Sequence, residues 1–277
     1  MYEEYFNLSR KPFQLSPDPG FFFGSSIHKR ALAYLRYGLS QAEGFIAITG
    51  DVGTGKTTLA RMLFRELPER EVVAAQIATT QLEADDLLRM VVQAFGLTVK
   101  SESKSALLDQ LETFLHKQAR EGKRALLVVD EAQNLSHAAL EELRMLSNFQ
   151  TGDRPLLQSF LLGQNQFKRT LQHPDLEQLR QRFIAACHLT PLDETETREY
   201  IEYRLGTAGW KNDPSFTDEA FADIYHYTKG IPRRINSLAD RLLLFAYLEE
   251  RHVIDPDVVR IVAGELEEEL NITDDQK

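Results

Sequence analysis

Residues 45–57 read FIAITGDVGTGKT, an apolar segment that runs directly into a glycine-rich loop. The loop from Gly50 to Thr57 matches the pattern G-x-x-x-x-G-K-[ST] at every fixed position. In this pattern the glycines let backbone N–H groups converge on phosphates, the lysine reaches the terminal phosphates, and the last hydroxyl helps to hold Mg²⁺. We therefore predict a phosphate-binding loop between a buried strand and a helix, formed by Gly50, Asp51, Val52, Gly53, Thr54, Gly55, Lys56, Thr57 and Thr58.

An acidic pair follows a second apolar segment. Residues 125–129 read ALLVV and lead into Asp130 and Glu131. An aspartate that leaves a buried strand can reach a metal ion on the phosphates, and a glutamate beside it can polarise an attacking water. We predict Thr57 and Asp130 as Mg²⁺ ligands and Glu131 as the base for hydrolysis. Acidic residues at the end of a strand are also common as solvated surface residues. The prediction for Asp130 and Glu131 therefore depends on the presence of the phosphate-binding loop.

Short apolar segments alternate with helical patterns through the first two thirds of the chain. The apolar segments lie at 45–49, 72–77, 125–129, 156–162 and 184–189, and the helical patterns lie at 57–66, 83–95, 105–121, 138–149 and 166–180. Such alternation predicts an α/β fold, with a parallel sheet covered by helices on both faces. Periodicity leaves the strand order open.

After Pro191 the strand pattern stops, and helical patterns follow at 194–208, 217–229, 232–249 and 256–268. Thr217 is placed as an N-cap, and prolines open the last two segments, where a missing N–H is tolerated. We expect a second, all-helical domain. The predicted organisation is an N-terminal arm and helix, a core that carries the phosphate-binding loop, a helical domain and an acidic tail, over 1–44, 45–190, 191–265 and 266–277.

Composition and charge narrow the class of protein. The chain has 277 residues and a formal net charge of −10, with 32 Lys and Arg against 42 Asp and Glu. Its longest apolar runs, such as 242–248, are far shorter than a membrane-spanning helix, and the N-terminus is not a secretory signal. We expect a cytoplasmic protein without direct membrane insertion.

Cysteine and histidine suggest no further chemistry. The single cysteine, Cys187, excludes an internal disulfide, and we expect a small buried hydrophobe there. The seven histidines show no metal-ligand spacing. We predict that His137, His173 and His226 lie at the surface or are partly buried.

Taken together, the loop, the acidic pair and the string GIPRRIN at 230–236 resemble the AAA+ ATPases. The chain is most similar to their ExeA-type branch. The strings that carry this likeness are MYEEYFNLSRKPFQLSPDPGFFF at the start, DEAQNLSHAALEELRMLSNFQ at 130–150, LLQSFLLGQ at 156–164 and LRQRF at 179–183. Within the branch it resembles ATPases encoded with exosortase and exopolysaccharide systems. The resemblance implies a P-loop NTPase of the AAA+, ASCE type, a three-layer sandwich with a parallel sheet and a C-terminal helical lid.

The resemblance also implies roles for polar residues outside the loop. Gln164 corresponds to sensor 1, which orients water or detects the γ-phosphate. Asn165 is the neighbouring alternative, and it stands where the family often has proline. Arg182 corresponds to the arginine that enters the nucleotide site of the next subunit, with Arg180 as the alternative. Arg233 matches sensor 2.

The N-terminal arm, including Phe13 and Pro17, resembles the segment that lines the adenine pocket in this family. Its aromatic residues fit plain core packing equally well. Both interpretations stay open at the level of the sequence.

Three functions follow from this interpretation. The first is an Mg²⁺-dependent ATPase that forms a homo-oligomeric ring or filament with active sites between subunits. It would remodel or regulate a protein partner in an envelope, exopolysaccharide or secretion system, and reach the inner membrane only through that partner. The second is an ATP-dependent DNA-associated switch that resembles transposition regulators, with residues 28–30 and 168–169 as the candidate DNA contacts. The acidic net charge of the chain disfavours this function. The third, a scaffold that binds nucleotide without hydrolysis, is disfavoured by intact Lys56, Asp130 and Glu131.

Overall fold

The computed structural model describes residues 1–277 except 17, 42, 69, 79–82, 100, 102 and 275–277, and only the backbone of 270–274. The chain divides into two compact units. The helical unit comprises residues 1–25, 53–58 and 190–277, and the sheet unit comprises 26–52 and 59–189. The N-terminal segment expected over 1–44 is therefore shared between the units: its arm groups with the later helices, and its helix groups with the sheet.

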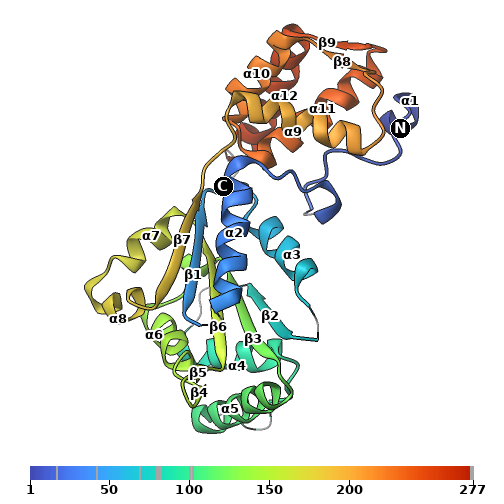
Figure 1. Cartoon of the computed structure of the whole chain (residues 1–277). Helices are drawn as coiled ribbons and strands as arrows, with labels where there is room; N and C mark the ends of the chain where they lie inside the picture. Colours follow the sequence, from blue (N-terminus) through green and yellow to red (C-terminus); the bar gives the residue numbers. More distant parts are fainter. Residues whose placement is uncertain are drawn as a thin grey trace. The chain divides into compact units, whose positions relative to one another are not determined.

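The sheet unit is built on five parallel strands in the order β2-β3-β6-β1-β7 (Figure 1). The strands are β1 (Phe45–Gly50), β2 (Val72–Ala78), β3 (Arg124–Asp130), β6 (Leu157–Gly163) and β7 (Phe183–Leu189). β1 pairs with β6 on one side and β7 on the other, and Ile48 is in register with Leu162 and Cys187. The predicted parallel sheet is confirmed, and Cys187 is buried in it as expected.

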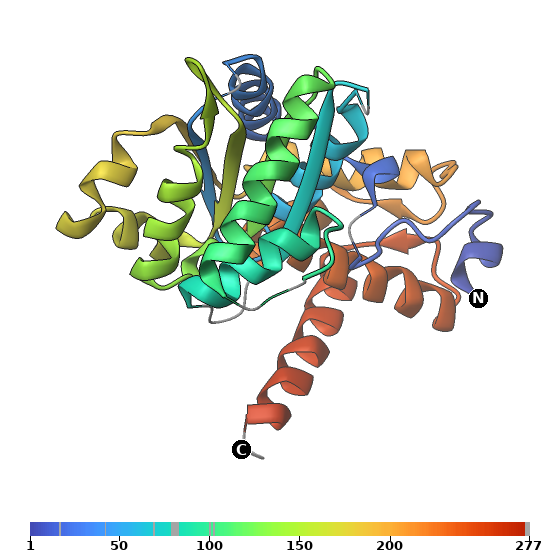
Figure 2. The same cartoon turned by 90° about the horizontal axis from the view of Figure 1, so that it is seen from below.

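Helices cover both faces of this sheet. α2 (Ser26–Gln41) packs on β1 and β7. An ion pair between Arg36 and Glu66, at 2.7 Å, joins α2 to α3 (Lys56–Glu66). The opposite face carries α4 (Ala84–Ala94), α5 (Lys104–Arg120) and α6 (His137–Leu146). Figure 2 shows α5, in green, and α2, in blue, on opposite sides of the sheet.

The strand side chains alternate between these two helical layers. Phe45 and Ala47 belong to the core beneath α4, α5 and α6. Ile46 faces α2, since a Cβ added at Gly38 of that helix would lie 1.9 Å from the Ile46 Cδ1 atom. The absence of a side chain at Gly38 therefore lets the helix lie close to β1. Burial on both faces explains why these strands read as continuous apolar runs.

One helix of the sheet unit differs from the prediction. The single helix expected over 166–180 is broken into α7 (Asn165–Leu171), a 3₁₀ turn η3 (Pro174–Leu176) and α8 (Glu177–Arg180). Pro174 lacks the N–H that a continuous α-helix needs, so the chain turns there. The structure also has a short antiparallel pair, β4 (Gln150–Thr151) with β5 (Arg154–Pro155), that the sequence pattern did not indicate.

The helical unit contains the four helices expected after residue 190, with α1 near the N-terminus (Figure 1). They are α9 (Glu194–Thr207), α10 (Asp218–Thr228), α11 (Pro232–Leu248) and α12 (Pro256–Asp274), and α1 spans Tyr2–Tyr5. The Thr217 hydroxyl accepts from the Ala220 N–H at 3.2 Å, as expected of an N-cap. The expectation of an all-helical domain needs correction, because β8 (Ser215–Phe216) pairs in parallel with β9 (Val253–Ile254). α12 also continues through most of the predicted tail.

The N-terminal arm supplies part of the core of the helical unit. Tyr2, Phe6, Phe13 and Phe21 are buried among residues of α9 to α12. The Tyr2 hydroxyl donates to Asp240 Oδ1 at 2.6 Å. A domain of about four helices gains much of its stability from such aromatic burial, so these first residues stabilise the helices that begin after residue 190.

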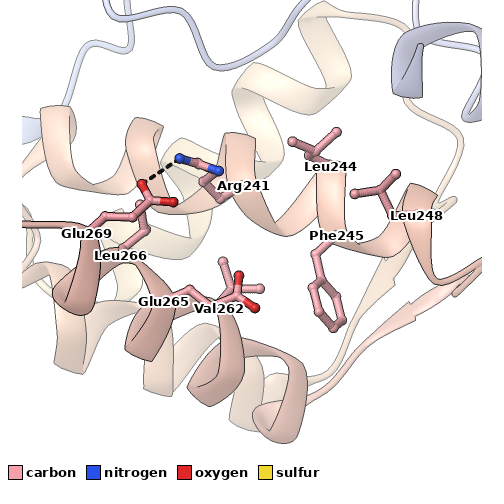
Figure 3. Close-up of a pocket in the computed structure, with 8 residues that line it drawn as sticks. All are labelled: Arg241, Leu244, Phe245, Leu248, Val262, Glu265, Leu266 and Glu269. Carbon is pink, nitrogen blue, oxygen red and sulfur yellow. Dashed lines mark hydrogen bonds and ion pairs between the residues drawn. The ribbon is translucent and has the colours of Figure 1, made fainter.

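A shallow groove lies between α11 and α12 of the helical unit (Figure 3). An ion pair between Arg241 and Glu269, at 2.7 Å, crosses one end of it. Leu248, 66% exposed, lies at the other end. None of the residues that line the groove belongs to the predicted phosphate site.

Candidate active site

The glycine-rich loop joins the end of β1 to the start of α3, which begins at Lys56. Gly53 and Gly55 have φ values of 84° and 98°, which glycine adopts readily and other residues adopt with strain. Thr54 is fully buried and Lys56 is 5% exposed. A helix N-terminus, left-handed glycines and a buried lysine form the arrangement that binds the phosphates of a nucleotide, so the loop fits such phosphates.

The predicted acidic pair lies at the carboxyl end of β3. Asp130 is the last residue of the strand and is 5% exposed. Its Oδ1 accepts from the Glu131 N–H at 3.0 Å. Strand register places Thr49 of β1 opposite Gly163 of β6, and Val129 of β3 opposite Leu161. The loop after β1, the acidic pair and Gln164 therefore leave the same edge of the sheet.

Glu131 has a backbone conformation that is unusual for its residue type. Its φ and ψ are 56° and 39°, in the left-handed region, which costs a residue with a Cβ roughly 1–2 kcal/mol. Its Oε2 accepts from Gln133 Nε2 at 2.5 Å and from Gln164 Nε2 at 3.1 Å. Gln133 also accepts the Gln164 backbone N–H through Oε1 at 2.9 Å. The two amides thus hold the carboxylate from two elements.

Gln133 is a site residue that the sequence reasoning missed. It lies in the 3₁₀ turn η2 (Ala132–Asn134) that follows Glu131. Its position two residues after Glu131 was visible, but glutamine in a turn has no signature of its own. Only the approach of β6 to β3 brings Gln164 within reach and shows what Gln133 does.

The two candidates for sensor 1 have different partners. Gln164 contacts Glu131, as described above. Asn165, the first residue of α7, donates through Nδ2 to Asp51 Oδ1 in the phosphate loop. Both side chains therefore lie at this edge of the sheet, and the assignment of sensor 1 to Gln164 stays a prediction.

Arg180 and Arg182 both have partners within the sheet unit. The Nη1 group of Arg180 donates to the carbonyls of Leu171 and His173, at 2.9 and 2.8 Å. Arg182 donates to Ser147 Oγ at 2.9 Å and to Asn148 Oδ1 at 2.5 Å. Arg180 thus closes the turn between α7 and α8, whereas Arg182 contacts only side chains at the end of α6 through these bonds.

Arg233 begins α11, one residue after Pro232, and belongs to the helical unit. Its backbone N–H donates to the carbonyl of Gly53, which groups with the same unit, at 3.2 Å. A Cβ at Gly53 would lie 2.6 Å from the Arg233 Cβ. The predicted sensor 2 residue therefore packs on the backbone of the phosphate loop, and its own side chain is exposed.

The remaining predicted residues are placed as follows. Thr57 follows Lys56 in the first turn of α3, and its hydroxyl and the Asp130 carboxylate are the hard oxygen ligands that Mg²⁺ prefers. Phe13 is 1% exposed, in the core of the helical unit. Pro17 lies outside the described residues.

Comparisons of the sequence with known proteins identify a matching family and a relative. Residues 39–171 match the family model described as an AAA domain. The chain is 39% identical over 267 residues, 96% of its length, to the general secretion pathway protein A of Aeromonas hydrophila. It spans 48% of that relative, about half of its length.

Solved structures agree on the fold. The ORC2 protein of Aeropyrum pernix, in ADPNP–ADP complexes, matches with a TM-score of 0.71 at 19% identity, over 93% of this chain and 72% of that one. The ORC1 protein of the same organism, in complex with DNA, matches with a TM-score of 0.68 at 18% identity, over 93% and 69%. Among the described residues, no helix combines the length and apolar character needed to cross a membrane.

Proposed function

We propose that this chain binds ATP with Mg²⁺ and hydrolyses the ATP, because residues 39–171 match the family model of an AAA domain. The observation that carries this proposal is the carboxylate of Glu131, held by Gln133 and Gln164 at the edge of the sheet from which the phosphate loop leaves. A strained backbone under an oriented carboxylate is typical of a catalytic position.

Each residue then has a task. Lys56 and the loop N–H groups hold the phosphates, while Thr57 and Asp130 hold Mg²⁺. The ion, when bound, supplies positive charge that stabilises the transferred phosphoryl group. Glu131 takes the proton of the attacking water, and Gln164 keeps the carboxylate in the required orientation.

The first test is steady-state ATP hydrolysis with a nucleotide-binding assay alongside. We expect Lys56→Ala to weaken ATP binding and remove hydrolysis, because the buried ammonium contacts the phosphates. The matched control is Lys168→Ala, at an exposed lysine of α7, which should bind and hydrolyse as the parent does. Equal ATP affinity in Lys56→Ala and the parent would contradict the proposed site.

We propose further that the active form is a homo-oligomer in which Arg182 serves the nucleotide of the neighbouring subunit. Ser147 and Asn148 accept from Arg182 in the isolated chain. In an oligomer the guanidinium would exchange these acceptors for phosphate oxygens, for which its planar fork is well suited. Arginines supplied in this way contribute roughly 10³–10⁵-fold in related phosphoryl-transfer systems.

Mixing two inactive variants tests this directly. Arg182→Ala keeps Glu131, and Glu131→Gln keeps Arg182, so a mixed oligomer contains some sites with both groups. We expect each variant alone to be inactive and the mixture to regain hydrolysis that rises with protein concentration. If Arg182→Ala alone hydrolyses at the parental rate, the shared site is wrong and the ATPase proposal still stands.

The partner we propose is a protein of a secretion or exopolysaccharide-export system, in which nucleotide state would alter the partner's conformation or assembly. The support is the 39% identity to general secretion pathway protein A, of which this chain spans 48%. A net charge of −10 disfavours a nucleic-acid partner. ATP-dependent binding to DNA that weakens steeply with salt would contradict a protein partner.

A further inference from the structure

His137 meets His173 and Asp175, which lie far from it in the sequence, at one corner of the sheet unit. His137 is the first residue of α6, after the N-cap Ser136. His173 caps the 3₁₀ turn η3, and Asp175 lies within that turn. Both histidines are exposed, as predicted, and the separation of 36 residues between them hid this cluster from any search for metal-ligand spacing.

The geometry brings their ligand atoms together. One nitrogen from each histidine and one carboxylate oxygen of Asp175 all lie within 4.8 Å of one another. The two imidazole rings are 4.5 Å apart between centroids, and His173 Nδ1 is 3.4 Å from Asp175 Oδ2. All three side chains are exposed, so an ion from solvent can reach them.

The donor set indicates which ion fits. Imidazole nitrogens bind Zn²⁺ and similar transition metals, whereas Mg²⁺ and Ca²⁺ prefer oxygen throughout. Three protein ligands and one water make a four-coordinate zinc site. Bonds of roughly 2.0–2.1 Å place neighbouring ligand atoms roughly 3.4 Å apart, so these exposed side chains need to rotate inward by about 1 Å.

We propose that His137, His173 and Asp175 form a binding site for Zn²⁺ or a similar transition-metal ion, separate from the proposed Mg²⁺ site at Asp130. The ion would join the first turn of α6 to the turn between α7 and α8. Arg180 already holds that turn through the carbonyls of Leu171 and His173. A bound ion therefore stiffens the segment 171–180, independently of any ATP hydrolysis.

The test is calorimetric titration of the nucleotide-free full chain with Zn²⁺, in excess Mg²⁺ to occupy oxygen-only sites. We expect one ion per chain. His137→Ala and His173→Ala should each weaken binding by at least about tenfold, because each removes a direct ligand. The control is His226→Ala, at an exposed histidine of α10 in the other unit, which should bind Zn²⁺ as the parent does.

A second readout separates coordination from misfolding. Co²⁺ in place of Zn²⁺ gives visible absorption that reports nitrogen and oxygen ligands, and Asp175→Asn should change this spectrum without altering the circular dichroism. Hydrogen exchange over 171–180 should slow when Zn²⁺ is added to the parent. No Zn²⁺ binding by the parent, or unchanged binding in the His137→Ala, His173→Ala double variant, would overturn the proposal.

Discussion

Glu131 in the sheet unit and Arg204 in the helical unit are both charged side chains held by polar neighbours, but their surroundings differ. Glu131 is half-buried, follows a strand, and accepts from Gln133 and Gln164. Arg204 is 6% exposed, in the last turn of α9. It donates through Nε to the carbonyl of Pro12 and through Nη1 to the Tyr200 hydroxyl, both at 2.7 Å.

The backbone separates the two cases. Glu131 has the left-handed conformation, whereas Arg204 lies in regular helix. The Arg204 guanidinium lies over the rings of Phe13, Phe21 and Tyr200, 6.0, 4.8 and 5.5 Å from their centroids.

Burial raises the pKa of Tyr200 even beside this cation, so the phenol stays protonated and donates to Asn236 at 2.8 Å. The contacts of Arg204 with Pro12, Phe13 and Phe21 fix the N-terminal arm to α9, whereas those with Tyr200 lie within the helix. The Glu131 carboxylate is thus held on a strained backbone that costs stability, which fits the catalytic role proposed for it, whereas the Arg204 guanidinium contributes to folding.

Glu131→Gln should separate chemistry from folding most clearly. The amide keeps the size of the side chain but cannot accept a proton, so we expect hydrolysis to fall by roughly 10²–10⁴-fold, about 3–5 kcal/mol of transition-state stabilisation. ATP affinity should be retained, and the free energy of unfolding should change by less than about 0.5 kcal/mol. Single-turnover hydrolysis and urea unfolding measure the two effects. If this variant hydrolysed ATP at the parental rate, a residue other than Glu131 would have to be the base.

Arg204→Met should show the reverse behaviour. Methionine fills part of the volume but leaves the Pro12 carbonyl without its donor and removes the cation from three rings. We expect a loss of roughly 2–4 kcal/mol in the free energy of unfolding, read from the urea midpoint.

The control for this change is Arg198→Met, on the same helix. Arg198 is exposed and pairs with Glu202 and Asp218, so its loss should cost less than about 1 kcal/mol. Equal losses in the two variants would mean that burial of Arg204 adds nothing, and the arm would then be fixed by its aromatic residues alone.

The sequence predicted the parts of this site that are contiguous along the chain. The phosphate loop and the acidic pair each follow a run of apolar residues, which predicts that each lies at the end of a strand. They lie at the same edge of the sheet because parallel strands share one carboxyl edge. The α/β class and the helices after residue 190 follow from the same periodicity.

The features that the sequence did not predict depend on residues that are distant in the sequence but close in space. Gln133 gains its meaning from the side chain of Gln164, and His137 from His173. The break in the helix over 166–180 was open to prediction, because Pro174 stands within it, and the helical periodicity on either side masked it. The place of the first 25 residues in the helical unit also follows only from long-range burial, as for Phe6 and Phe21.

Gln133→Ala tests the smallest expected effect. Gln133 follows Glu131 closely in the sequence, but its role depends on its contact in space with Gln164. The variant removes one of the two donors to Glu131 and leaves Gln164 in place, so the carboxylate should sample more orientations. We expect kcat to fall by about tenfold, or about 1.4 kcal/mol, with KM for ATP unchanged because Gln133 is not predicted to contact the nucleotide. Gln133→Glu is the matched variant: it keeps the length but places a second carboxylate beside Glu131, so it should lower kcat further through repulsion. If both variants retained the parental kcat, the bond from Gln133 would be a feature of the resting chain alone, and Gln164 would be left as the residue that orients Glu131.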